Sequence, residues 1–189
     1  MSKFTYREEW LTECAKLLAA EFNLTMPDKW RVAASWPVGG RGGSNNRILG
    51  QCFHPSSSAD GHTEMLITWG DADPLSVAAT LCHEMIHAAV GVEQGHNKVF
   101  ADEARRCGLD GKPTATVAGA EFIQRSKKIL RSLGKYPHAV VTVSHQKQST
   151  RMHKVECEDC GYIARTSAKW LTEMGSPICP CNGEHMRVA

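Results

Sequence analysis

Apolar side chains recur at the spacing of an α-helix in four stretches of this chain. The helices that they predict span residues 4–22, 74–90, about 97–107 and 119–133. The second has suitable residues at both ends, because Asp73 can cap its first turn, Pro74 fits the first helical position, and Gly91 can end it. In the third helix the side chains expected to face inward are Val99, Phe100, Ala104 and Cys107.

Alternating apolar and polar residues predict strands between these helices. Residues 30–36 show the alternation most clearly, and further candidates are residues 47–53, 63–69 and 138–144. Residues 110–119 combine Gly, Pro and Thr and are expected to form a linker. Helices and strands in this irregular order favour an α+β fold over a regular βαβ repeat.

A chain of 189 residues can form one compact domain and a small module, which we place at residues 1–137 and 138–189. The small module at residues 138–189 would begin with a basic strand. No apolar run approaches the roughly 18 residues that cross a bilayer, and the first ten residues lack the apolar core of a secretory signal. We therefore expect a cytoplasmic protein whose eight cysteines are reduced or metal-bound and not paired in disulfides.

Charged residues are unevenly distributed along the chain. Residues 1–103 carry 8 Lys and Arg against 13 Asp and Glu, a net of −5, whereas residues 104–154 carry 11 against 2, a net of +9. Residues 155–189 carry 3 against 5, a net of −2. The basic central block favours a polyanionic partner, and the alternative is a solvated helix face and loop.

The segment TLCHEMIHAAVGVEQGH, residues 80–96, contains an H-E-x-x-H pattern on a predicted helix. His83 and His87 are four residues apart, so both imidazoles lie on one helix face and can reach one metal ion. Glu84 lies beside the first histidine and could activate a zinc-bound water as a general base. The alternative is a buried helix whose histidines bond to backbone carbonyls.

A catalytic zinc ion takes three protein ligands and leaves one position for water. His96 is the preferred third ligand, because glycines at positions 91 and 95 could turn the chain back toward the first two histidines. Glu93 and Glu103 are the alternatives. Glu93 stands where some H-E-x-x-H enzymes have their third histidine, and Glu103 could otherwise pair with a neighbouring arginine.

The run LCHEMIHAAVG followed by GHNKVFADEARRCGL resembles the SprT-like, or Spartan-type, metalloprotease family. The matching residues are His83, Glu84, His87, Gly95, His96 and Phe100, and the upstream LGQCF resembles the strand before the active-site helix. The resemblance implies a zincin-like core of helices on a small mixed sheet. It also implies an endopeptidase with a catalytic zinc, whose best-known relatives act in DNA repair on proteins crosslinked to DNA and are activated by DNA.

The C-terminal segment has the spacing of a structural zinc ribbon, with two cysteine pairs separated by eighteen residues. The expected ligands are Cys157, Cys160, Cys179 and Cys181. The second pair is one residue shorter than usual, so His185 or His153 could replace one cysteine. A redox dithiol is the alternative for the first pair. The remaining cysteines, Cys14, Cys52, Cys82 and Cys107, lie in apolar patterns and are expected to be buried.

Basic side chains beside aromatic ones suit single-stranded nucleic acid, because the aromatic rings stack on bases and the cations meet phosphates. Tyr162 and Trp170 are the aromatic candidates, although they could equally pack the ribbon. The candidate basic contacts are Arg125, Lys127, Lys128, Arg131, Lys147, Arg151, Lys154, Arg165 and Lys169.

The histidine and cysteine patterns predict one catalytic and one structural Zn²⁺, and the resemblance to the SprT-like family implies an endopeptidase that acts on DNA-associated or DNA-crosslinked proteins. We expect a protein substrate and DNA as partners, no membrane, and an extended peptide pairing with the strand at 63–69. Two alternatives remain open: a non-catalytic DNA-binding adaptor with two structural zinc ions, and a zinc hydrolase with a substrate unrelated to DNA.

Overall fold

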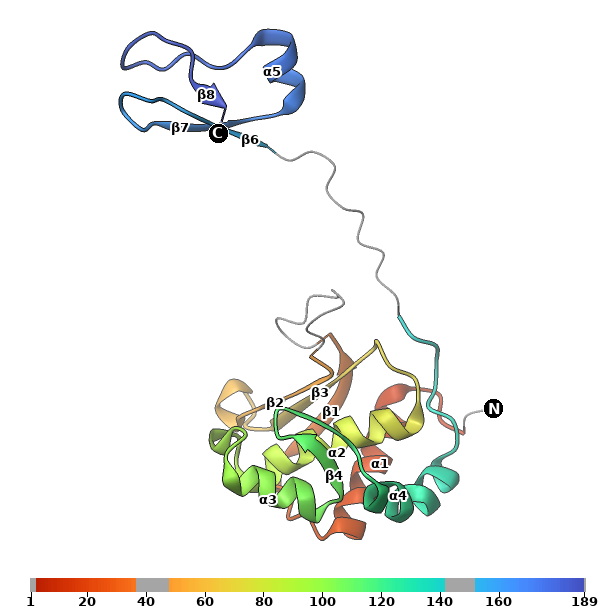
Figure 1. Cartoon of the computed structure of the whole chain (residues 1–189). Helices are drawn as coiled ribbons and strands as arrows, with labels where there is room; N and C mark the ends of the chain where they lie inside the picture. Colours follow the sequence, from red (N-terminus) through yellow and green to blue (C-terminus); the bar gives the residue numbers. More distant parts are fainter. Residues whose placement is uncertain (1–2, 37–47, 142–151, 189) are drawn as a thin grey trace. The chain divides into compact units, whose positions relative to one another are not determined.

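The computed structural model describes residues 3–36, 48–141 and 152–188 (Figure 1). The chain divides into two compact units, residues 1–143 and 144–189. Helices and small mixed sheets make this an α+β protein, as the sequence predicts. In the described part of the chain, no helix combines the length and the apolar character needed to cross a membrane.

Within the described residues, the first unit contains four α-helices and five strands. The helices are α1 (Arg7–Phe22), α2 (Pro74–Val90), α3 (Lys98–Arg106) and α4 (Ala120–Leu133). The strands are β1 (Trp30–Ser35), β2 (Gly50–Phe53), β3 (Thr63–Thr68), β4 (Leu109–Lys112) and β5 (Ala115–Ala118), and short 3₁₀ turns occupy Pro55–Ser57 and Val92–Gln94. The four predicted helices and the strands expected at 30–36, 47–53 and 63–69 are thus confirmed within a few residues at their ends.

A three-stranded sheet in the order β1-β3-β2 supports the helices. β1 runs parallel to β3, with Trp30 opposite Thr63, and β2 runs antiparallel to β3, with Gly50 opposite Ile67. β3 is therefore the central strand, and its two edges are already paired. The expectation that residues 63–69 pair with a peptide is wrong for this reason, and β2 is the edge strand on that side of the sheet.

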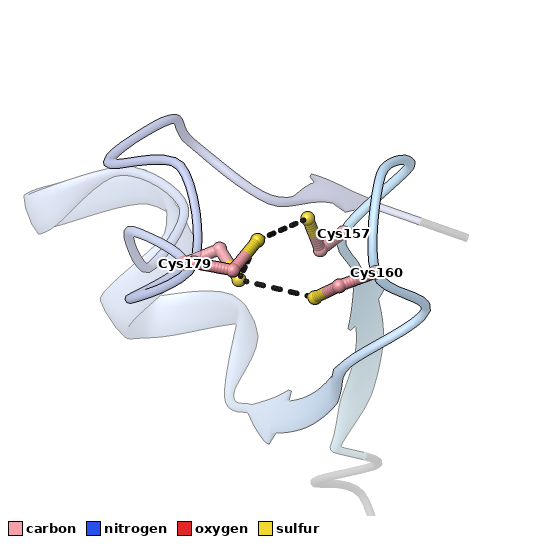
Figure 2. Close-up of side chains that lie close together, drawn as sticks. Cys157, Cys160 and Cys179 are labelled. Atoms are coloured by element: carbon pink, nitrogen blue, oxygen red, sulfur yellow. Dashed lines mark hydrogen bonds between the residues drawn. The ribbon is translucent and has the colours of Figure 1, made fainter.

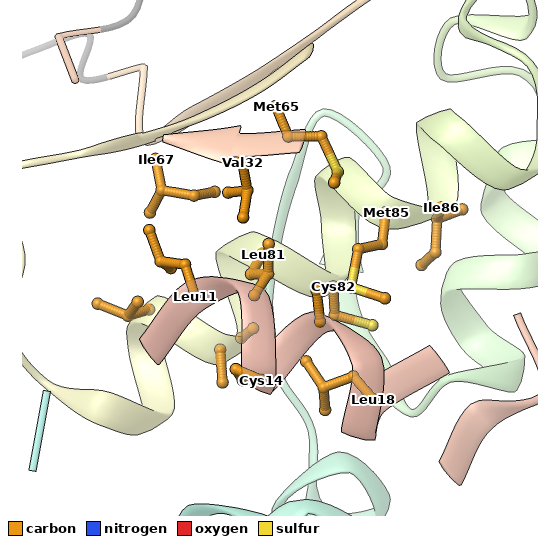
Figure 3. Close-up of a cluster of buried hydrophobic side chains, with 14 of the residues drawn as sticks. Leu11, Cys14, Leu18, Val32, Met65, Ile67, Leu81, Cys82, Met85 and Ile86 are labelled. Carbon is orange, nitrogen blue, oxygen red and sulfur yellow. The ribbon is translucent and has the colours of Figure 1, made fainter. Parts of the chain in front are cut away.

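The hydrophobic core lies between this sheet and the helices α1 and α2 (Figure 3). Figure 3 shows Val32, Met65 and Ile67 from the sheet meeting Leu11 of α1 and Leu81 of α2. All five side chains are at most 6% exposed. Each such burial stabilises the fold by about 1.5–3 kcal/mol relative to exposure, so α2 is firmly held where it carries the His-Glu pattern.

Residues 110–119 form no linker. β4 and β5 pair antiparallel from Leu109 opposite Ala118 to Lys112 opposite Ala115, which makes a β-hairpin of this segment. Leu109 anchors it in the core at 2% exposure, while the other strand positions are exposed or half-buried. A strand of this kind has no apolar face to mark it in the sequence, which explains why the linker prediction failed.

Two further expectations were wrong. Val99 is 51% exposed, so it lies on the outer face of α3, unlike the buried Phe100, Ala104 and Cys107. Residues 138–141 form no strand, although the Val141 N–H donates a hydrogen bond to the carbonyl of Trp69, just past the end of β3, at 3.0 Å. The rest of the strand expected at 138–144 lies outside the described residues.

Over residues 152–188, the second unit is a small sheet in the order β7-β6-β8 with one helix. Its elements are β6 (His153–Glu156), β7 (Ile163–Thr166), α5 (Ala168–Met174) and β8 (Arg187–Val188). Its buried hydrophobic residues are Val155, Cys157, Cys179 and Met186. A core of this size needs a further source of stability, such as a disulfide or a metal ion.

Candidate functional site

Helix α2, which carries His83, Glu84 and His87, has well-defined ends. The Asp73 carboxylate accepts a hydrogen bond from the Ser76 N–H at 2.9 Å, which satisfies one of the free donors of the first turn. Gly91, with a φ of 98°, ends the helix. The two histidines lie one turn apart within this helix and present their imidazoles on the same face.

The chain returns to this face over a short turn. Gly95 has a φ of 51° and a ψ of −132°, a backbone conformation open to glycine and strained for other residues. Asn97 then caps α3, since its side-chain oxygen accepts a hydrogen bond from the Val99 N–H at 2.9 Å. His96, between the glycine and the cap, is thereby directed back toward His83 and His87.

The three histidines meet through the same ring atom. His96 Nε2 lies 3.2 Å from His83 Nε2 and 3.2 Å from His87 Nε2. Tetrahedral zinc with Zn–N bonds of about 2.0–2.1 Å separates its ligand nitrogens by about 3.3 Å, so the spacing fits one such ion. Within the described residues the donor group has three members, His83, His87 and His96.

The environment keeps these imidazoles neutral, as metal ligands must be. Burial, with the neighbouring histidines, lowers the pKa of His83 to about 3, and burial lowers the pKa of His87 to about 4. Burial also lowers the pKa of the more exposed His96. The fully buried Phe100 packs against all three, with ring centroids 4.8, 4.2 and 5.0 Å from His83, His87 and His96.

Glu84 is 5% exposed and does not join the donor group. The edge strand β2 covers it: a Cβ atom placed on Gly50 would lie 2.5 Å from Glu84 Oε1, so a larger residue there would displace the Glu84 side chain. Burial raises the pKa of the Glu84 carboxyl to about 8. The arrangement therefore combines three neutral nitrogen donors with a separate carboxyl group able to exchange a proton near neutral pH.

The alternative third ligands are placed elsewhere. Glu103 forms an ion pair with Arg106, at 2.5 Å between Oε1 and Nη2. The Glu93 carboxylate lies against the backbone of Gly91, and neither glutamate belongs to the donor group. The sequence-based preference for His96 agrees with this geometry.

One neighbour of the site is absent from the sequence prediction. Thr116, on strand β5, places its Oγ1 atom 2.8 Å from His83 Nδ1. The sequence contains no local signal for this contact, because Thr116 follows His83 by 33 positions and lies in the segment predicted as a linker. It depends on how the β4–β5 hairpin packs along α2.

A second donor group in the second unit consists of Cys157, Cys160, Cys179 and Cys181 (Figure 2). Sγ–Sγ distances are 3.6 Å for Cys157 and Cys181, 3.6 Å for Cys160 and Cys179, and 3.3 Å for Cys179 and Cys181. Zn–S bonds of about 2.3 Å in a tetrahedron separate sulfurs by about 3.8 Å, so this group also fits a single metal ion.

No cysteine of this group is replaced by a histidine. His185 Nδ1 lies 2.5 Å from the Ser176 carbonyl, and His153 lies in β6 opposite Thr166. Hydrogen bonding from the Cys160 backbone lowers the pKa of the Cys157 thiol below its usual value, which favours the thiolate that binds metal.

The basic residues proposed to contact nucleic acid differ in their surroundings. Arg125 pairs with Glu21 and Glu121, and its guanidinium lies 4.1 Å from the centroid of the Phe22 ring. Within the described residues, the exposed side chains of Lys127, Lys128 and Arg131 on α4 and of Arg165 on β7 form no hydrogen bond or ion pair.

On the second unit, Lys154 pairs with Glu156, and Lys169 lies 5.0 Å from the ring centroid of the 52%-exposed Trp170. Tyr162 is also exposed, at 53%. The predicted contacts Lys147 and Arg151 lie outside the described residues. Cations and exposed aromatic rings thus lie close together on this unit.

Comparison with known proteins gives no relative to set beside this geometry. No protein-family model matches the sequence, and neither the curated proteins nor the solved structures gave a match.

Proposed function

We propose that the chain is a zinc-dependent endopeptidase of the SprT-like type, with a zincin-like catalytic unit and a C-terminal zinc ribbon. The observation that carries the proposal is the set of three Nε2 atoms about one point, with the Glu84 carboxyl on the same helix but outside the donor group. Three donors leave a coordination position open, whereas a structural site would supply a fourth.

Zinc bound to the three histidines would supply Lewis acidity that lowers the pKa of water and polarises a peptide carbonyl. Glu84 would accept a proton from the attacking water and deliver it to the leaving amine. Its place beside His83 on α2, outside the group of donor atoms, suits both steps, because the carboxyl stays free of the metal.

The edge strand β2 is the proposed place for the substrate backbone. It borders the sheet in the order β1-β3-β2, and its Gly50 lies against Glu84. An extended peptide that adds to this edge would be held by main-chain hydrogen bonds, a mode that tolerates many side chains. Such a mode suits an enzyme that cleaves proteins of varied sequence.

DNA is the proposed partner that brings substrate to the enzyme, so that proteins bound or crosslinked to DNA would be cleaved. The exposed cations Lys127, Lys128 and Arg131 on α4 support this proposal, as do the exposed aromatic rings on the ribbon. Phosphate contacts of this kind weaken steeply as salt rises, so cleavage stimulated by DNA should decline between low and moderate salt.

The decisive test is the Glu84→Gln variant of the full chain. The variant keeps the size and position of the side chain but removes its proton-accepting group. We expect it to retain both zinc ions and to lose at least about 100-fold in the rate of cleavage of a DNA-bound protein, the usual scale of general-base catalysis. Mass spectrometry of the metal measures the zinc content, and gel electrophoresis of the substrate measures cleavage.

A Glu13→Gln variant changes a half-buried side chain of α1 that makes no hydrogen bond or ion pair within the described residues, so it serves as the control and should cleave like the wild type. Undiminished cleavage by Glu84→Gln would refute the assigned role of Glu84. A wild-type protein that binds two zinc ions and DNA but cleaves nothing would instead favour a non-catalytic adaptor.

A further inference from the structure

The β4–β5 hairpin reaches the side of the His83 ring that faces away from the other histidines. Along β5 the side chains alternate, so that Thr116 and Ala118 are half-buried while Ala115 and Val117 are exposed. Thr116 Oγ1 lies 2.8 Å from His83 Nδ1, within hydrogen-bond distance.

The direction of this hydrogen bond follows from the metal geometry. His83 Nε2 points into the three-histidine group, 3.2 Å from His96 Nε2. An ion held there would take the lone pair of Nε2, which leaves the ring proton on Nδ1. The Nδ1–H group would then donate to Thr116 Oγ1, and the threonine would select the tautomer that binds metal.

The hairpin is held firmly at its base. The Gly119 N–H donates to the Gly108 carbonyl at 3.1 Å, and Leu109 is buried in the core. Gly108 has a φ of 76°, and a Cβ atom there would lie 2.5 Å from the backbone nitrogen of Phe122. The Thr116 hydroxyl is therefore positioned by a short hairpin anchored at both strands.

His83 differs in this respect from its partner on α2. Within the described residues, His87 Nδ1 is buried without a hydrogen-bond partner. The orientation of the His87 ring depends on packing, since Phe100 stacks on it at 4.2 Å between centroids. His83 has the hydrogen bond in addition, so the two ligands are oriented by different means.

We propose that Thr116 is a positioning residue, which fixes the tautomer and ring orientation of His83 and so strengthens zinc binding by the three histidines. The inference rests on the proposed function, because it requires zinc at that group. Outer partners of histidine ligands typically change metal affinity by about 10–100-fold.

The test compares Thr116→Val, which keeps the shape but removes the hydroxyl, with Thr116→Ser, which retains it. Zinc is titrated into the full chain in competition with a chromophoric chelator. A His83→Ala variant lacks one ligand of the histidine group, so its titration curve identifies the step that belongs to the four cysteines of the ribbon. The remaining step of the wild-type titration is then the histidine step. For Thr116→Val we expect the histidine step to weaken about 10–100-fold while the ribbon step stays unchanged, and Thr116→Ser should stay near the wild type.

Thr114→Val is the matched control. It makes the same change in the turn of the same hairpin, where the Thr114 side chain is exposed and, within the described part, makes no hydrogen bond. Thr116→Ala provides a second removal of the hydroxyl should the valine fold poorly. Circular dichroism of the metal-free variants shows whether each is folded.

A nuclear magnetic resonance measurement tests the tautomer itself. In the zinc-loaded wild type we expect a slowly exchanging His83 Nδ1–H signal, which should shift or exchange rapidly in Thr116→Val and persist in Thr114→Val. Wild-type affinity of the histidine step in a folded Thr116→Val overturns the role of Thr116 and leaves the proposed function standing. A wild type that takes up zinc only at the ribbon overturns both, and the titration distinguishes the two results.

Discussion

The ionisable residues of the histidine site are buried together, and burial acts on them in opposite directions. His83 and His87 become harder to protonate, with pKa values of about 3 and about 4. Glu84, between them on α2, becomes harder to ionise, with a pKa of about 8. Burial disfavours the charged form in each case. In the metal-free protein near neutral pH, all three side chains are therefore mostly uncharged.

These shifts predict how the stability of the metal-free protein depends on pH. Because the folded histidines have pKa values below the usual 6.5, the unfolded chain binds more protons as pH falls below about 6.5, and their contribution to stability is lost on acidification. Glu84 acts oppositely, since its folded pKa lies above 4.5 and stability from its protonated form grows as pH falls from about 8 toward 4.5.

The Glu84→Gln variant separates the two effects. Its free energy of unfolding without metal should fall between pH 7 and pH 5 by on the order of 2 kcal/mol, after allowance for the partial exposure of the histidines. The metal-free wild type should fall by less, because Glu84 compensates. Urea unfolding at both pH values measures the difference, and equal slopes for the two proteins would contradict the assignment of a raised pKa to Glu84.

At the scale of elements, two strands position the chemistry carried by one helix. β2 brings the Gly50 backbone against Glu84, and β5 brings Thr116 against His83. Both contacts depend on close backbone approaches that glycines permit. Gly108, at the base of the hairpin, is the clearest example, because its φ is 76° and Phe122 N would lie 2.5 Å from an added Cβ.

Gly108→Ala should therefore lower the free energy of unfolding by more than its backbone conformation alone explains. Gly134→Ala is a matched control, because Gly134 has a φ of 75° but no atom within 4 Å of an added Cβ. Gly134 has a φ of 75° and a ψ of −157°, a region that favours glycine, so we expect a loss of about 1–3 kcal/mol for Gly134→Ala. For Gly108→Ala we expect a further loss of about 1 kcal/mol or more. Urea unfolding of the zinc-loaded proteins measures both, and equal losses would refute the close contact.

At the scale of the whole molecule, the two units differ in what stabilises them. The first unit has a large core that includes Cys14, Cys82 and Cys107, each 0% exposed. The second unit buries few hydrophobic residues, and two of those are cysteines of its donor group, Cys157 and Cys179. Metal binding by the four cysteines would supply stability that its core lacks.

Removal of metal should consequently affect the units differently. With a strong chelator, we expect the four cysteines of the second unit's donor group to be alkylated rapidly while Cys14, Cys82 and Cys107 stay protected until the first unit unfolds. Iodoacetamide labelling followed by peptide mass spectrometry locates the modified thiols, and added zinc should restore protection of the ribbon. Rapid labelling of the three core cysteines, or chelator-independent protection of the ribbon, would contradict this division.

Local patterns were sufficient for the long, strongly periodic elements. The helix at 74–90 was predicted with its cap and its end, because Asp73, Pro74 and Gly91 act within a few residues of their own positions. Prediction failed for the hairpin at 109–118, whose alternating side chains are mostly exposed, and for residues 138–141, where apolar side chains suggested a strand. In both cases, burial and pairing depend on distant residues.

The sequence by itself determined the chemistry that this protein can carry: two histidines and a glutamate at helical spacing, a glycine-flanked third histidine, and four cysteines in two pairs. The tertiary structure alone decided which strand borders the site and which hydroxyl meets His83. The reason is that spacing along a helix is fixed by local geometry, whereas the neighbours of Glu84 and His83 come from β2 and β5, which reach α2 only through packing of the whole unit.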